Sequence, residues 1–269
     1  MQINLVKLPT KKFLYFSLLA IGLTIVTANF FGQEIAGTIT NLLYVPIPGV
    51  LLVLSAIIAA RFRGKGVHGK AWILFFGLAC SWFIAEQLWV LYDLVFHVDP
   101  FPSEADFFYL LGYPFLFLFS IYYLRPVEKA ITKKILIYAF SFSIVLLVPT
   151  VYITSTSNSE ASWSEIILAA SYPAADVVVM FPAVVGLVLF FKGEVNFFWA
   201  LTSLAIMMNV IADTGFLLTS LNDSYYTGSP IDILYLWSYV MFSFGVYSHI
   251  KIFKTRSYEK KYFDLEGLR

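Results

Sequence analysis

Acidic side chains interrupt the apolar runs of this chain, and their types and positions suit the binding of a cation. Glu86, Asp176 and Asp213 lie well inside such runs, and no Lys or Arg lies within any of the runs. In a membrane, a charged side chain at mid-bilayer costs about 2.5–3.5 kcal/mol even on lenient scales, so each acid must be protonated, hydrated or paired with a cation. We expect at least one of the three to carry a proton at neutral pH until a cation binds. A protonated acid with a purely structural hydrogen bond is the alternative.

Helical spacing brings further residues to the faces that carry these acids. Glu86, Trp89 and Asp93 follow an i, i+3, i+7 pattern, and Asn209 lies four residues before Asp213. Aromatic faces together with carboxylates suit an organic cation, whereas carboxylate oxygens alone suit a metal ion. The predicted ligand-binding residues are Glu86, Trp89, Asp93, Asp106, Tyr109, Tyr113, Asp176, Asn209, Asp213, Asp232 and Tyr235.

Some of these residues also have a simpler interpretation. Asp106 and Asp232 lie where helices are predicted to begin, and Asp is a preferred N-cap that complements the helix dipole. Trp89, Tyr109 and Tyr235 lie near the predicted membrane surface, where aromatic residues form belts. It therefore stays open whether the two Asp residues only cap helices and whether the three aromatic residues only anchor the protein at the membrane surface.

The elements that must position these side chains are transmembrane helices. Hydrophobic residues make up 59% of the chain and charged residues 13%, against about 25% charged residues in a soluble domain. A spanning helix needs roughly 20 apolar residues. Eight segments qualify: 13–31, 42–60, 72–96, 106–124, 135–153, 164–191, 196–219 and 231–250. The predicted fold is an all-α integral membrane protein with a single transmembrane domain over residues 1–269, and with outer loops at about 32–41, 97–105, 154–163 and 220–230.

The charges are sorted between the two sides of these segments. All 18 Lys and Arg residues fall on one side, together with only five acidic residues, whereas the other 12 acids lie in the segments or beyond them. An excess of Lys and Arg marks the cytoplasmic side. We therefore expect a multi-pass protein of the cell membrane with both termini in the cytoplasm. The short tail 255–269 is expected to lie against anionic lipid headgroups.

An internal repeat is visible in the sequence. Four residues recur 126 positions later: Asp106, Tyr109, Leu110 and Tyr113 correspond to Asp232, Tyr235, Leu236 and Tyr239. Halves of four spans, 1–130 and 131–254, would be parallel and related by a pseudo-twofold axis along the membrane normal. Chance matching is the alternative, because Phe, Trp and Tyr make up 19% of the residues.

The sequence lacks the residues that several kinds of chemistry need. The three histidines, His68, His97 and His249, lie near the ends of predicted spans, so no helix offers paired His ligands for haem or zinc. We predict no cofactor and no nucleic-acid partner. Catalysis is not expected, although acid–base chemistry on a lipid stays open.

Three short motifs resemble those of a known family. They are Glu86-x-x-Trp89, the string Pro-Ser-x-Ala-Asp-x-x-Tyr-Leu over 102–110, and Tyr172-Pro173-x-x-Asp176. Together they are similar to multi-span sensor regions that precede diguanylate cyclase and histidine kinase domains in bacteria and archaea. The resemblance covers the third to sixth spans. It implies that the membrane part perceives a signal. The residues that it points to are Glu86, Trp89, Asp106, Tyr109, Tyr113 and Asp176.

The chain departs from that family because it has no output domain after its last span. The sequence therefore favours a ligand-sensing or receptor-like module that acts through a separate partner protein at the cytoplasmic face. Its other expected partners are membrane lipids and a small cationic ligand. A small cation- or proton-coupled transporter and an accessory subunit of a membrane complex are the alternatives.

Overall fold

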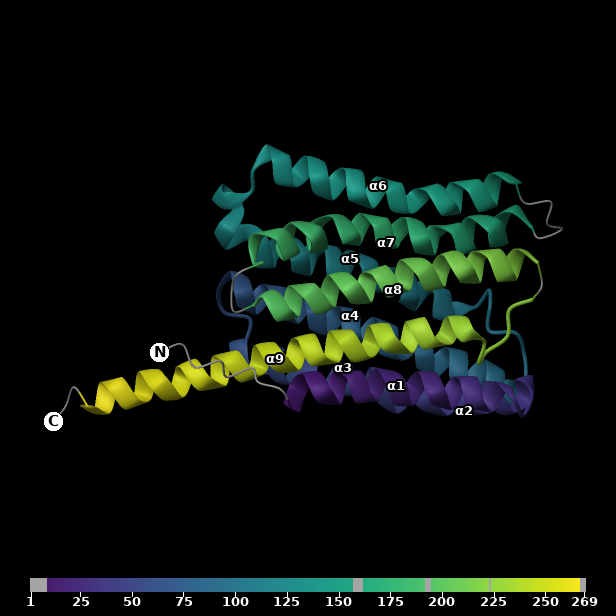
Figure 1. The fold of residues 1–269 in the computed structure, drawn as a ribbon, viewed down its shortest axis with the longest axis horizontal. Coiled ribbons are helices and arrows are strands. Elements are labelled where there is room, and N and C mark those ends of the chain that lie inside the picture. The colour runs from purple at the N-terminus through teal and green to yellow at the C-terminus, as the bar shows by residue number, and fades with distance from the viewer. Residues whose placement is uncertain (1–8, 157–161, 192–194, 223, 267–269) are drawn as a thin grey trace.

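Helices make up nearly all of the regular structure of this chain. The computed structural model describes residues 9–156, 162–191, 195–222 and 224–266, with side chains up to residue 252, and these residues contain no strand. The helices are α1 (Pro9–Asn29), α2 (Gln33–Tyr44), α3 (Pro46–Phe62), α4 (Gly66–Val90), α5 (Glu104–Leu124), α6 (Lys133–Thr156), α7 (Trp163–Leu189), α8 (Asn196–Leu221) and α9 (Pro230–Glu266) (Figure 1). A π-helical turn, Leu91–Phe96, continues α4, and a 3₁₀ segment, Arg125–Ala130, follows α5.

Eight helical segments of the described chain are long and apolar enough to cross a membrane. Three of them are composite, because α2 joins α3 as Gln33–Phe62, α4 joins the π-helical turn as Gly66–Phe96, and α5 joins the 3₁₀ segment as Glu104–Ala130. The other five are α1, α6, α7, α8 and the first part of α9. The prediction of an all-α fold with eight segments that are able to span a membrane is therefore confirmed.

The predicted outer loop 32–41 is wrong, because α2 occupies most of it. Its polar residues resemble those of a loop, but Thr40 and Asn41 are fully buried against the rest of the bundle. The helix stops just before Pro46, which has no N–H with which to continue it. Pro48 likewise cannot bond the carbonyl of Tyr44, and the Gln87 side chain donates to that oxygen at 3.3 Å instead.

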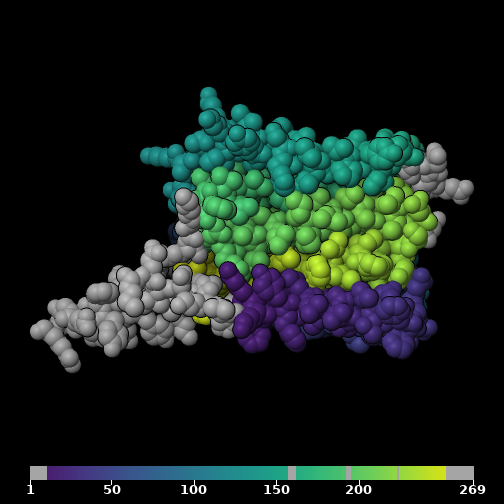
Figure 2. All heavy atoms as spheres, viewed as in Figure 1, coloured from purple at the N-terminus to yellow at the C-terminus, as the bar shows by residue number. Residues whose placement is uncertain are grey.

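Six helices form a closed ring. Going round it, α3 packs against α4, α4 against α5, α5 against α7, α7 against α8, α8 against α9, and α9 against α3. The helix α1 packs outside the ring against α9 and α2, and α6 packs outside it against α7 and α8. Figure 2 shows α1 and α2 along one side of the molecule and α6 along the other, with α8 and α9 between them.

One end of the ring carries the basic residues and is densely packed inside. The turn after α3, the 3₁₀ segment and the projecting part of α9 lie at this end, which we call the basic end (Figure 1). Within it, Trp72, Phe75, Phe119 and Phe198 are fully buried. Neighbouring rings contact one another with centroids 4.9 Å apart for Phe75 and Phe119 and 5.5 Å apart for Trp72 and Phe198. This aromatic cluster fills the basic half of the ring.

Candidate functional site

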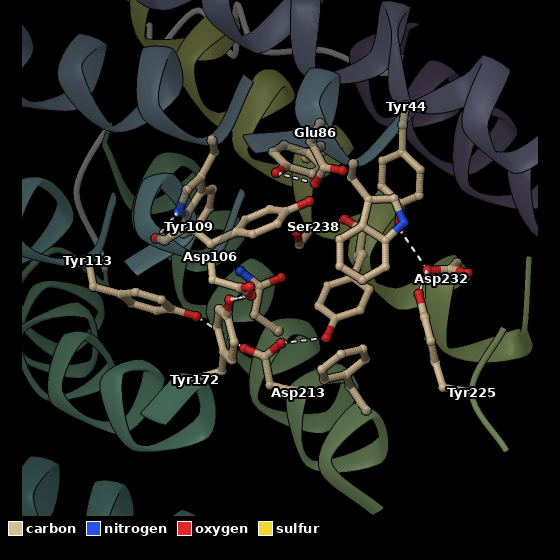
Figure 3. Close-up of a pocket in the computed structure, with 16 residues that line it drawn as sticks. Tyr44, Glu86, Asp106, Tyr109, Tyr113, Tyr172, Asp213, Tyr225, Asp232 and Ser238 are labelled. Carbon is tan, nitrogen blue, oxygen red and sulfur yellow. Dashed lines mark hydrogen bonds between the residues drawn. The ribbon is translucent and has the colours of Figure 1, made fainter. Parts of the chain in front are cut away.

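A cavity of about 70 Å³ occupies the other half of the ring, away from the basic end. Its walls come from α2, α4, α5, α7, α8, α9 and the segment that precedes α9 (Figure 3). The side chains that line it are mainly aromatic and acidic, and none of them is Lys or Arg. They are Tyr44, Trp82, Glu86, Trp89, Asp106, Tyr109, Tyr113, Tyr172, Asn209, Asp213, Phe216, Tyr225, Asp232, Tyr235, Ser238 and Tyr239.

The structure brings nine of the eleven predicted site residues to this one cavity. Asp93 and Asp176 are the two that do not line it. Sequence reasoning missed seven lining residues: Tyr44, Trp82, Tyr172, Phe216, Tyr225, Ser238 and Tyr239. Helical spacing could have found Trp82, four residues before Glu86, and Phe216, three after Asp213.

Asp93 leaves the face that it was predicted to share with Glu86. The α-helical spacing ends at Val90, and the wider π-helical turn that follows rotates later residues away from that face. The Asp93 side chain is half-buried and accepts a hydrogen bond of 2.5 Å from Asn41 Nδ2 on α2. Its observed role is to join the π-helical turn to α2.

Asp176 lies behind the cavity wall and is completely buried. Tyr172, one turn earlier on α7, faces the cavity, whereas Asp176 faces α5 and α8, where Tyr113 and Asp213 lie close to it. Neither of its oxygens has a hydrogen bond of ordinary geometry within the described chain. A buried carboxyl group without a donor is costly to ionise, and Asp176 lies next to Asp213, an acid of the cavity.

The two deep acids of the cavity each accept hydrogen bonds from tyrosines. Tyr239 donates to Glu86 Oε1 at 2.7 Å, and Tyr113 donates to Asp213 Oδ2 at 3.0 Å. Tyr235 also donates to Asp213 (Figure 3). The first two bonds cross the molecule in opposite directions, because each joins a tyrosine of one half of the chain to an acid of the other.

The same exchange occurs around the two acids at the helix starts. Tyr44 donates to Asp232 Oδ1 at 3.0 Å, and Tyr172 donates to Asp106. Tyr225 adds a second phenol to Asp232, at 3.1 Å. Four phenol–carboxylate hydrogen bonds, counted over both pairs of acids, therefore connect the first half of the chain to the second through the cavity wall.

The N-cap interpretation of Asp106 and Asp232 is wrong in position, because both residues lie in the first turn of their helices and Ser103 is the N-cap of α5. Asp106 accepts from the backbone N–H of Ser103 at 2.6 Å, within a capping box at the start of α5. Asp232 accepts from the backbone N–H of Gly228 at 2.6 Å at the start of α9. Each carboxylate thus accepts from a backbone N–H at the start of its helix with one oxygen and from tyrosine with the other.

The segment before α9 lies across the cavity at the end opposite the basic end. Tyr225 packs on Phe216 with ring centroids 4.7 Å apart, and Trp89 donates to Thr227 Oγ1 at 3.2 Å. Burial raises the pKa of the Tyr225 phenol, as does the nearby charge of Asp232, so this phenol stays protonated and donates. The segment is therefore tied to the cavity by both aromatic and polar contacts.

A glycine allows this segment to approach α2. Gly228 has a φ of +93°, which disfavours any other residue. A Cβ at this position would lie 2.5 Å from the backbone carbon of Ala36. The close approach fixes the position of the Gly228 N–H, which donates a hydrogen bond to the Asp232 carboxylate.

The donor set of the cavity combines carboxylates with aromatic faces. Four buried carboxylates face the cavity, and aromatic faces lie between them. However, within the described residues no three His, Cys, Asp or Glu side chains come close enough together to hold a metal ion. Carboxylates spaced apart by tyrosine and tryptophan rings are suited to an ammonium group, which gains from both ionic and cation–π contact.

We expect Gly112→Ala to destabilise the wall that supports the cavity. A Cβ on residue 112 would lie 2.1 Å from Nε1 of Trp82, a lining residue whose indole donates to the Tyr109 carbonyl. Overpacking of this kind costs about 1–3 kcal/mol, so the melting temperature should fall by roughly 2–12 °C. Gly49→Ala is the matched control, because its Cβ would lie 3.6 Å from Phe83. Equal melting temperatures for the two variants would show that the Gly112 contact is not tight.

No family model matches the chain, and searches of the curated proteins and of the solved structures found no match. The resemblance to membrane sensor regions therefore stays a prediction that rests on the residues of its motifs. What can be said of function comes from the cavity itself.

Proposed function

We propose that this chain is a membrane-embedded, receptor-like module that binds a small organic cation in the cavity. The observation that carries the proposal is that Glu86, Asp106, Asp213 and Asp232 are all buried around one cavity whose lining contains no basic side chain. Buried carboxylates require compensation, and hydrogen bonds from tyrosines supply only part of it. A cation in the cavity would complete it.

The size of the cavity limits the ligand. Pockets for drug-sized molecules typically measure about 300–1,000 Å³, whereas this cavity measures about 70 Å³. Tyrosine and tryptophan rings provide faces for an alkylammonium group. A compact ammonium ion therefore fits the site, and a long lipid chain does not.

We propose that the ligand reaches the cavity from outside the cell. The distribution of Lys and Arg supports a cytoplasmic basic end, with both termini on that side. The cavity is in the opposite half of the ring, and the aromatic cluster around Trp72 and Phe119 separates it from the basic end. A small extracellular ligand would then meet a site that is closed towards the cytoplasm.

The helix α9 offers a direct connection from the cavity to a partner. It carries Asp232, Tyr235 and Tyr239 in the cavity wall and continues as one helix to Glu266, beyond the rest of the bundle (Figure 1). A change in the contacts of these three side chains would move the projecting part. The resemblance to sensor regions supports such a transfer to a separate signalling protein.

The crossed hydrogen bonds support the proposed internal repeat. Tyr113 and Tyr239 are 126 residues apart, and they exchange bonds with acids that are themselves 127 residues apart, Asp213 and Glu86. Two parallel halves related by a pseudo-twofold axis would produce such an exchange. In this interpretation the ligand lies between the two halves of the chain, so that its binding depends on their relative position.

A cation transporter is the second candidate, because prolines that weaken helices lie beside the cavity in both halves. The helix is broken between α2 and α3 at Pro46, just after Tyr44, whereas Pro173 follows Tyr172 inside α7, which continues to Leu189. Broken helices next to a central site are a feature of transporters. Flux of methylammonium into vesicles that contain the protein would support transport, whereas binding without flux would support the receptor-like module.

The binding proposal is tested by titrating purified protein with methylammonium while recording tryptophan fluorescence, since Trp82 and Trp89 line the cavity. Acetamide serves as a neutral probe of comparable size. We expect saturable binding of methylammonium and none of acetamide. Equal responses to both, or no response to either, would contradict the proposal.

A further inference from the structure

A second hollow, of about 460 Å³, lies at the basic end and is separate from the cavity. It is bounded by α5, the 3₁₀ segment, α6 and α7. Its volume is within the range of about 300–1,000 Å³ that is common for ligand pockets. It shares no lining residue with the cavity.

The hollow exists because α6 and α7 diverge towards the basic end (Figure 1). Pro182 lies inside α7 at the hollow, and it cannot donate a backbone hydrogen bond to the preceding turn. Such a proline favours a bend in the helix. The main packing partners of α6 are α7 and α8, and α6 makes little direct contact with α5.

The interior of the hollow is apolar and its mouth is polar. Ile121, Leu136, Phe181 and Val185 provide aliphatic and aromatic walls. Ile121 and Leu136 are 43% and 39% exposed, so the hollow is open towards the surroundings of the bundle. Its charged lining residues are Arg125 and Glu128, both on the 3₁₀ segment. An apolar slot that ends at a guanidinium is matched by a molecule with an apolar tail and an anionic head.

The charge around the mouth is strongly positive. Arg125, Lys129, Lys133 and Lys134 are all exposed within ten residues of chain, and Glu128 is the one acid among them. Basic pockets between transmembrane helices at the cytoplasmic side bind anionic lipid headgroups. A guanidinium also matches the geometry of a phosphate through two parallel hydrogen bonds.

We propose that this hollow binds one anionic phospholipid from the leaflet at the basic end. An acyl chain fills the space between Ile121 and Leu136, and the phosphate lies at Arg125. The bound lipid completes the packing of α6 against α5. This site is independent of the cation site, because the hollow and the cavity have different lining residues, and the hollow lies at the basic end whereas the cavity lies away from it.

The test measures lipid binding by native mass spectrometry of the full chain in detergent with dioleoyl phosphatidylglycerol or dioleoyl phosphatidylcholine. We expect the first phosphatidylglycerol to bind more tightly than phosphatidylcholine. Arg125→Ala should weaken it by about fivefold, the effect of one basic residue at a membrane surface. Lys70→Ala, which removes an exposed basic residue elsewhere at the basic end, should leave it unchanged.

A second pair of variants tests the apolar part of the site. Leu136→Trp should fill the hollow and reduce binding of the first lipid, whereas Ile137→Trp, at a neighbouring position that is 62% exposed and outside the lining, should not. Equal binding of the two lipids together with no effect of Arg125→Ala would overturn the proposal in favour of unspecific lipid contact. So would equal effects of the two tryptophan variants.

Discussion

Glu86→Gln is expected to weaken methylammonium binding by about thirtyfold and to leave the fold intact. Glu86 is buried in the cavity wall and is bonded to Tyr239. Removing one charge from a buried ion pair costs at least about 2 kcal/mol, and 1.4 kcal/mol is a factor of ten. The glutamine has the same shape and is cheaper than an acid in the membrane. The affinity is measured by the tryptophan fluorescence titration.

Glu34→Gln is the matched control for this experiment. Glu34 lies in the first turn of α2, is exposed and does not line the cavity. The variant changes the net charge by the same amount, so it separates a local contact from a general electrostatic effect. We expect wild-type affinity for Glu34→Gln. Equal losses in the two variants would mean that Glu86 does not contact the ligand.

The second large effect is expected when both crossing tyrosines lose their hydroxyl groups. Tyr113→Phe and Tyr239→Phe each leave a buried carboxylate oxygen without its donor. An unmade hydrogen bond of this kind costs about 1–3 kcal/mol. The double variant should therefore lose roughly 2–6 kcal/mol of stability, seen as a lower melting temperature and a lower midpoint of chemical unfolding.

Tyr247→Phe is the control on the same helix as Tyr239, because its side chain is 44% exposed. It should unfold like the wild type. If the double variant is as stable as Tyr247→Phe, the crossed hydrogen bonds do not hold the two halves together. A loss of stability in only one single variant would show that the two crossings are not equivalent.

The membrane-spanning elements could be predicted from the sequence because apolar runs of sufficient length have few other uses. The runs at 135–153 and 196–219, for example, lie inside α6 and α8. The eighth run was predicted to end near residue 250, and α9 continues to Glu266. The charged residues after about residue 250 end the apolar run and so the predicted span, but they do not prevent the helix from continuing.

The polar part of the bundle was harder to predict. Asn41 belongs to a stretch that resembles a loop, but it lies on a helix whose polar face is buried. The π-helical turn that reorients Asp93 has no clear signal in composition. Which way Asp176 faces depends on the rotation of α7 against α5 and α8, and this rotation is a property of tertiary packing.

The acids that line the cavity could be predicted because an uncompensated carboxylate in an apolar run has a high cost. Their tyrosine partners could not be assigned from one sequence with this much aromatic content. The pairing of Tyr239 with Glu86 joins residues more than 150 positions apart, and only the closed ring of helices brings them together. Helical periodicity describes one helix face at a time and contains no information about which faces meet.

The proposed function requires a cation that compensates the acids of the cavity, and the pH dependence of binding tests this requirement most directly. Protons and the cation compete for the carboxyl groups of the cavity, so protonation opposes binding. The affinity for methylammonium should therefore rise between about pH 5 and pH 8 in the wild type, and this dependence should be smaller in Glu86→Gln. The measurement is the dissociation constant of methylammonium for both forms across this range. An affinity that is the same at every pH, or a dependence that Glu86→Gln leaves unchanged, would contradict the account and leave these acids with a purely structural role.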